Sequence, residues 1–113
     1  MAFDWSIMIQ GAAGATAQFV PQGGAPGSPL AVKPNDIVSW GNDTPETHQP
    51  WPTDSSYNLQ PAPPNPNLSD PIFAQQSSSP AYVVPGDAKP GTIYYRCKTH
   101  PDRPEYGQIV IGA

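Results

Sequence analysis

The sequence predicts an all-β protein, a Greek-key antiparallel β-sandwich of about seven strands. Short runs that alternate apolar and polar residues recur along the chain, and turn residues separate them. Seventeen prolines and ten glycines among 113 residues argue against long helices. The runs carry Trp, Tyr, Ile and Val, so disorder is not expected. This length fits one domain spanning residues 1–113.

The first half of the chain supplies four of the predicted strands. Phe3 to Gln10 alternates apolar and polar side chains with a period of two, which is the pattern of a half-buried strand. The turn Lys33-Pro34-Asn35-Asp36 places Pro and Asx residues where a reverse turn favours them. The four strands are expected at residues 3–10, 17–20, 30–32 and 37–40.

The middle of the chain lacks a regular pattern. Gly41 to Pro52 is predicted as a loop, and it contains His48. From Thr53 to Pro80 no periodicity remains and prolines recur. We therefore predict a Pro-rich loop insertion at about residues 50–80. A patternless segment of this length is uncommon inside a compact domain unless it covers a site.

The C-terminal third predicts a short strand and then a strand, loop and strand. The short strand is Tyr82–Val84, and residues 92–97 and 108–111 each alternate in the period-two pattern. The loop between the last two strands holds Cys97-x-x-His100, then Glu105 and Gly107. A thiolate and an imidazole on one tight loop are two ligands of a transition-metal site.

The candidate metal ligands are few. Cys97 is the one cysteine of the chain, and His48 and His100 are its two histidines. A trigonal arrangement of two imidazoles and one thiolate, with a weak fourth ligand, is typical of an electron-transfer copper site. The alternatives are a buried structural thiol for Cys97 and a solvated turn residue for His48.

Four segments carry a resemblance to a known family: Val38–Asn42, His48, Tyr95–His100 and Gly107–Val110. They resemble the cupredoxins, the plastocyanin-like blue copper proteins. That family carries the pattern Cys-x-x-His-x-x-x-x-Met-x-Gly, with a further histidine on a loop after an earlier strand. The resemblance implies a cupredoxin-like β-sandwich and one copper ion, bound by the two histidines and the cysteine.

One position departs from the family pattern. Glu105 stands where the axial methionine is expected, with Gly107 in register after it. A carboxylate favours Cu(II), so an axial Glu105 predicts a lowered potential and a non-blue or perturbed spectrum. The ligand set is similar to that of nitrosocyanin, the red-copper branch of the family. Glu46 and Asp102 are the rival carboxylates, and Arg103 could instead pair with Glu105 and hold it off the metal.

The function predicted from these residues is that of a mononuclear copper protein and one-electron carrier, with a redox protein as its partner. The alternative is a mononuclear copper enzyme, or a small-molecule-binding protein of the red-copper type, with an open coordination position. A third class is copper buffering or sensing, or a zinc-filled structural site. The two histidines are already used as ligands, so hydrolase chemistry of the Ser-His-Asp kind is disfavoured.

Charge and hydropathy exclude some partners. The formal net charge is −4 and the sequence has no basic stripe to neutralise phosphates, so nucleic acid is not an expected partner. No run approaches the roughly eighteen apolar residues of a membrane span. The N-terminus lacks the features of a signal peptide, and we expect a mature periplasmic or extracellular domain, with a cytoplasmic one as the alternative. The oligomeric state is left open.

Overall fold

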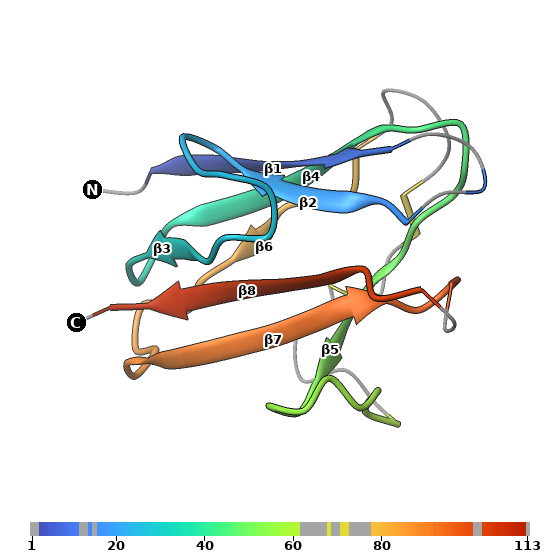
Figure 1. The fold of residues 1–113 in the computed structure, drawn as a ribbon. Coiled ribbons are helices and arrows are strands. Elements are labelled where there is room, and N and C mark those ends of the chain that lie inside the picture. The colour runs from blue at the N-terminus through green and yellow to red at the C-terminus, as the bar shows by residue number, and fades with distance from the viewer. Residues whose placement is uncertain are drawn as a thin grey trace.

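The computed structural model describes residues 3–11, 14, 16–61, 68, 71–72, 78–100 and 103–112. Within these residues the chain forms eight strands, which make two four-stranded sheets stacked as a sandwich (Figure 1). No helix in this part of the chain is both long enough and apolar enough to cross a membrane. The all-β sandwich predicted from the sequence is confirmed.

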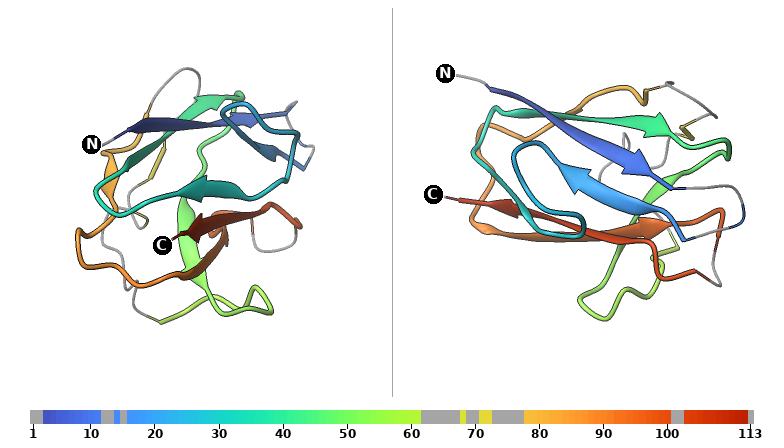
Figure 2. Two further views of the ribbon diagram at one scale, coloured as in Figure 1. Left: turned by 90° about the vertical axis from the view of Figure 1, so that its left-hand side faces the viewer. Right: turned by 45° about the horizontal axis from the view of Figure 1, so that its top comes forward.

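Each sheet combines strands from distant parts of the chain. The first sheet has the order β2-β1-β4-β6, made of β2 (Gln18–Pro21), β1 (Asp4–Gln10), β4 (Ile37–Asp43) and β6 (Tyr82–Val83). The second has the order β3-β8-β7-β5, made of β3 (Leu30–Val32), β8 (Tyr106–Ile111), β7 (Gly91–Cys97) and β5 (Pro50–Thr53). In the views of Figure 2, β1 begins and β8 ends at the same end of the sandwich.

The sheets differ from the prediction in one respect, because they are mixed rather than purely antiparallel. β1 pairs in parallel with β4, and β3 pairs in parallel with β8. The chain leaves the first sheet after β2, forms β3 in the second sheet and returns as β4, so β4 runs in the same direction as β1. Parallel and antiparallel strands share the same period of two, so the alternation in the sequence could not separate them.

β5 was predicted as part of a loop, and this was wrong. Pro50 and Pro52 leave no strand signal in this segment, because proline has no N–H for the ladder. The structure places β5 at the edge of the second sheet, where proline is tolerated, and Pro50 lies opposite Cys97. The strand therefore joins the chain just after His48 to the end of β7.

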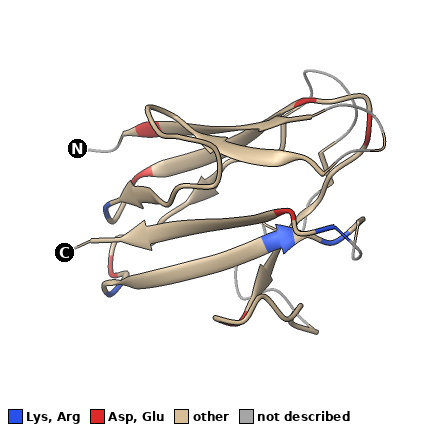
Figure 3. Ribbon diagram, viewed as in Figure 1, with Lys and Arg blue, Asp and Glu red and all other residues tan. Residues whose placement is uncertain are grey.

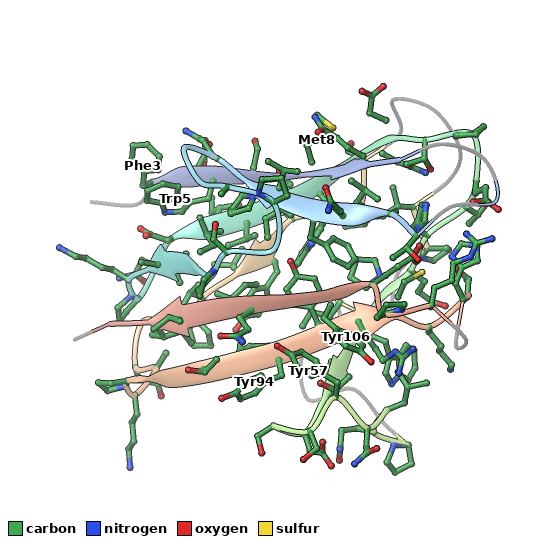
Figure 4. The ribbon with its side chains drawn as sticks, in the orientation of Figure 1. Phe3, Trp5, Met8, Tyr57, Tyr94 and Tyr106 are labelled. Carbon is green, nitrogen blue, oxygen red and sulfur yellow. The ribbon has the colours of Figure 1, made fainter. Side chains whose placement is uncertain are left out.

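The predicted Pro-rich insertion contributes to the core where it is described. Leu68 and Ile72 are fully buried, whereas residues 62–67, 69–70 and 73–77 lie outside the described part. Tyr57 has a left-handed backbone (φ 62°), and its ring stacks on Tyr106 at 4.2 Å between centroids (Figure 4). The insertion thus supports the start of β8, directly after Glu105.

The core lies between the two sheets and closes around one tyrosine. The Tyr95 ring makes edge contacts with Phe19 at 4.9 Å and with Trp40 at 5.5 Å. These aromatic contacts join both layers two residues before Cys97. The other large buried apolar residues of the two inner faces include Ile7, Ile9, Val38 and Ile109.

Candidate metal centre

Four potential ligands meet at one end of the sandwich. His48 lies between β4 and β5, Cys97 is the last residue of β7, and His100 and Glu105 lie between β7 and β8. Backbone bonds hold these segments together: Cys97 N–H donates to Glu105 O at 3.0 Å, and Lys98 N–H donates to Gln49 O at 2.9 Å. The pairing of strands therefore sets the distance between the two ligand segments.

The donor atoms of the four residues converge on one point. Cys97 Sγ lies 3.5 Å from His48 Nδ1 and 3.4 Å from His100 Nδ1. Glu105 Oε1 lies 3.4 Å from His48 Nδ1 and 3.2 Å from His100 Nδ1. Two donors about 2.0–2.3 Å from one tetrahedral metal ion are about 3.3–3.8 Å apart. The spacing of the donors fits a single transition-metal ion, and all four ligand atoms lie within 4.8 Å of one another.

The cluster is shielded from water on all but one side. His48 and Cys97 are fully buried, and Glu105 is 1% exposed. The His100 side chain is 15% exposed. One imidazole therefore reaches the protein surface while the other three donors stay inside.

His48 is held by its backbone and by its outer ring nitrogen. Its N–H and C=O both bond to the backbone of Ile72. Its Nε2 lies 2.9 Å from Thr44 Oγ1. The single Thr44 hydroxyl proton has two nearby acceptors, Asn42 Oδ1 at 2.7 Å and Glu46 O at 3.0 Å. Thr44 Oγ1 therefore accepts from His48 Nε2–H, and in the neutral ring the Nδ1 lone pair faces the cluster.

The Cys97 thiol is poised to ionise. Burial raises its pKa, but hydrogen bonds with His48 and Thr99 outweigh burial and lower the pKa to about 7. Thr99 Oγ1 lies 3.0 Å from the sulfur and also bonds to Thr47 O. A thiolate is thus available near neutral pH, which is the form that binds a metal.

The pKa of His48 is shifted upward, whereas that of Cys97 is shifted downward. Burial lowers its pKa, but the neighbouring Cys97 and Glu105 raise it to about 9. In the metal-free protein the ring is therefore protonated on both nitrogens at neutral pH. A metal ion must displace the proton on Nδ1 to bind there.

Glu105 is ionised although it is buried. Burial raises its pKa, but hydrogen bonds with His48 and the Ala17 N–H lower it to about 2. The Ala17 N–H donates to Oε2 at 2.7 Å, so Oε1 is the oxygen that faces the histidines. Arg103 lies 3.9 Å from Oε2 and pairs more closely with Glu46, at 2.8 Å.

Of the two rival carboxylates, the structure describes only Glu46. Glu46 Oε2 is 3.8 Å from His100 Nε2, the ring nitrogen that points away from the sulfur, and Glu46 is not a member of the four-residue cluster. Asp102 lies outside the described residues.

Comparison with known proteins identifies the fold. No protein-family model and no curated protein matches the chain. Among solved structures, a novel purple cupredoxin from Nitrosopumilus maritimus matches with a TM-score of 0.63 and 19% identity, covering 95% of this chain and 98% of that one. The chain has the cupredoxin fold.

Two further solved structures are similar to this chain in fold. A reduced Cu(I) form of an amicyanin mutant gives a TM-score of 0.58 at 16% identity, covering 95% of this chain and 80% of that one. A variant of the McoA multicopper oxidase from Aquifex aeolicus gives 0.61 at 12% identity, covering 100% of this chain and 28% of that one. The cupredoxin-like sandwich expected from the sequence resemblance is confirmed.

Several residues that shape the cluster were not found from the sequence. Thr44 and Thr99 contact the ligands through their hydroxyls, and Ile72 and Ala17 contact them through backbone groups. The Asn42-x-Thr44 segment carries a turn signal, because Asn side chains accept from the N–H two residues later. The backbone donor of Ala17 leaves no signal in the residue type.

Proposed function

We propose that the protein is a mononuclear copper protein that carries single electrons. His48, Cys97, His100 and Glu105 are the proposed ligands of one copper ion. The observation that carries the proposal is the convergence of their four donor atoms within 4.8 Å of one another, with each histidine Nδ1 3.2–3.5 Å from the Cys97 sulfur and from Glu105 Oε1. This largely buried cluster lies on a fold shared with solved copper proteins.

The chemistry of the donors favours copper. Thiolate stabilises Cu(I), imidazole suits both oxidation states and carboxylate favours Cu(II). When bound, copper supplies a Cu(II)/Cu(I) couple. The chain holds the donors in place through Ile72 and Thr44 at His48, and through the β7–β8 pairing at Cys97 and Glu105. Donors fixed in this way need little rearrangement when one electron arrives or leaves.

The exposed edge of His100 supports a protein partner. It is the one donor residue of the cluster that is not fully buried, with a side chain 15% exposed. Electron transfer to a redox protein would take the shortest route through this ring. We propose such a partner, and a periplasmic or extracellular location, which fractionation of cells that produce the protein would check.

A nearby cavity bears on the alternative of a copper enzyme. The cavity has a volume of about 460 Å³ and is lined in part by Ala17, Pro104 and Tyr106. It flanks Glu105, yet none of the four proposed ligands lines it. A small molecule in this cavity would contact residues beside Glu105 and not the donors themselves.

Copper titration of the purified protein tests the proposal. We expect one copper per chain, a thiolate-to-copper absorption band and a reversible one-electron wave in voltammetry. We expect azide to leave the absorption and EPR spectra unchanged. Copper bound without a reversible wave would contradict electron carriage, and a native metal content of zinc alone would favour the structural site.

A Glu105→Met variant tests the fourth ligand. We expect a higher reduction potential and a spectrum shifted toward the strong absorption of blue sites, because the thioether is softer and uncharged. Asp43→Asn is the matched control, since Asp43 is exposed at the end of β4 and outside the cluster. If Glu105→Met leaves both the spectrum and the potential unchanged, Glu105 is not a ligand.

The pH dependence of metal affinity follows from the His48 proton. The His48 pKa is raised to about 9 in the metal-free protein, so below pH 9 binding releases that proton. Apparent affinity should rise about tenfold per pH unit between about pH 7 and 9, and level off above. Competition titrations against a chelator of known pH dependence measure this slope. An affinity that is flat between pH 7.5 and 8.5 would contradict it.

A further inference from the structure

An arginine and a glutamate bridge the edge of the four-donor cluster. Arg103 Nη1 lies 2.8 Å from Glu46 Oε1, and its Nη2 lies 3.4 Å from Glu46 Oε2. This bidentate geometry fixes the plane of the guanidinium. The same Nη1 lies 3.9 Å from Glu105 Oε2. Glu46 thus holds a cation next to the outer oxygen of the Glu105 carboxylate.

The two oxygens of Glu105 have separate surroundings. Oε2 accepts from the Ala17 N–H at 2.7 Å and faces the Arg103 guanidinium. Oε1 lies 3.2–3.4 Å from the Nδ1 atoms of His48 and His100. Without a cation and a donor at Oε2, a carboxylate in this position could turn and present both oxygens to a metal ion.

We propose that Arg103 is a positioning residue that makes Glu105 a one-oxygen ligand. The proposal rests on the proposed metal site. The guanidinium, fixed by Glu46, keeps Oε2 on the Ala17 side and leaves Oε1 toward the histidines. The chain then offers four donor atoms rather than five.

Glu46 has a separate part in this arrangement. It accepts the two guanidinium bonds and is also within 3.3 Å of the Gly14 N–H. If Glu46 were neutral, the Arg103 guanidinium would lose its closest anion and move toward Glu105, the other carboxylate beside it. Arg103 would then compete with the metal for Glu105. Removal of Arg103 and removal of Glu46 therefore have different expected effects.

The first test uses the metal-free protein. In Arg103→Gln we expect the Ala17 amide proton to exchange at least tenfold faster with solvent, because Glu105 Oε2 no longer stays beside it. The Gln22 amide lies directly after β2 and donates to Ser6 O of β1; it reports general loosening of this sheet, and its exchange rate should stay unchanged. Arg103→Lys should give an intermediate rate, since it restores the charge without the bidentate pair.

The matched control is Lys98→Gln. Lys98 belongs to the group of basic residues at the end of β7 and in the loop after it (Figure 3). Its ammonium lies over the Trp51 ring at 3.6 Å from the centroid. The control removes the same charge from the same end of the sandwich, so we expect Ala17 exchange to match that of the unaltered protein.

The second test uses Co(II) as a probe of coordination number. We expect intense ligand-field absorption, typical of four-coordinate Co(II), in the unaltered protein and in Lys98→Gln. We expect weaker absorption in Arg103→Gln, where a second Glu105 oxygen joins. Glu46→Gln should keep the four-coordinate spectrum and bind Co(II) about 10–100-fold more weakly.

The outcomes separate this proposal from the proposed function. If the unaltered protein shows no thiolate-to-metal band with Co(II) or copper, the metal site itself is wrong. If it binds both metals but Ala17 exchange and the Co(II) spectrum are the same in Arg103→Gln and Lys98→Gln, the positioning role is overturned. Faster Ala17 exchange together with the weaker Co(II) absorption, in Arg103→Gln but not in Lys98→Gln, supports it.

Discussion

A Cys97→Ser variant is expected to lose the thiolate-to-copper absorption band and to bind copper more than about a hundredfold more weakly. Loss of an outer-shell partner alone typically costs about 10–100-fold in metal affinity, and a direct ligand is worth more. The sulfur is also the softest of the four donors and the one that favours Cu(I). Absorption spectroscopy and competition titration with a Cu(I) chelator measure the two effects.

The fold should survive this substitution. Cys97 is fully buried at the end of β7, and serine is close to it in size, with Thr99 Oγ1 as a ready hydrogen-bond partner. Circular dichroism and thermal unfolding of the metal-free variant provide the control. A Cys97→Ser protein that is folded and keeps the visible band would rule out Cys97 as the metal ligand.

The parts of the fold that sequence could predict are those that depend on one local pattern. β1, β7 and β8 follow a period of two, and their inner residues, Ile7, Tyr95 and Ile109, are buried as the alternation requires. The β1–β4 and β3–β8 pairings depend on the path of the chain between sheets, which no local pattern records. β5 depends on its place at an edge, which local propensity cannot reveal.

The candidate site likewise has residues that the sequence predicts and contacts that only the tertiary structure shows. The rarity of the residues and the Cys97-x-x-His100 spacing predicted three members of the four-donor cluster, and the family register predicted Glu105. The structure brings these four together, while their identity as metal ligands stays a prediction. The partner that orients Glu105, the Ala17 N–H, is 88 residues away in sequence. A backbone donor is common to almost every residue, so only the tertiary fold shows which one is used.

A Gly107→Ala variant is expected to destabilise the metal-free protein by about 3 kcal/mol or more. Gly107 of β8 lies opposite Tyr95 of β7, and a Cβ at this position would overlap the Tyr95 ring. The ring cannot easily give way, because it is 1% exposed and packed edge-on against Phe19 and Trp40. Urea unfolding followed by tryptophan fluorescence measures the loss.

Gly91→Ala is the matched control at the other end of β7. The nearest atom to its added Cβ is Lys89 O at 4.0 Å, so we expect a change within about 0.5–1 kcal/mol. Equal stability of the two variants would show that the ring moves freely. Because Tyr95 is two residues before Cys97 and Gly107 two after Glu105, displacement of the ring would also separate two proposed ligands. Metal affinity should therefore fall in Gly107→Ala and stay unchanged in Gly91→Ala, which makes this glycine a requirement of the site as well as of the core.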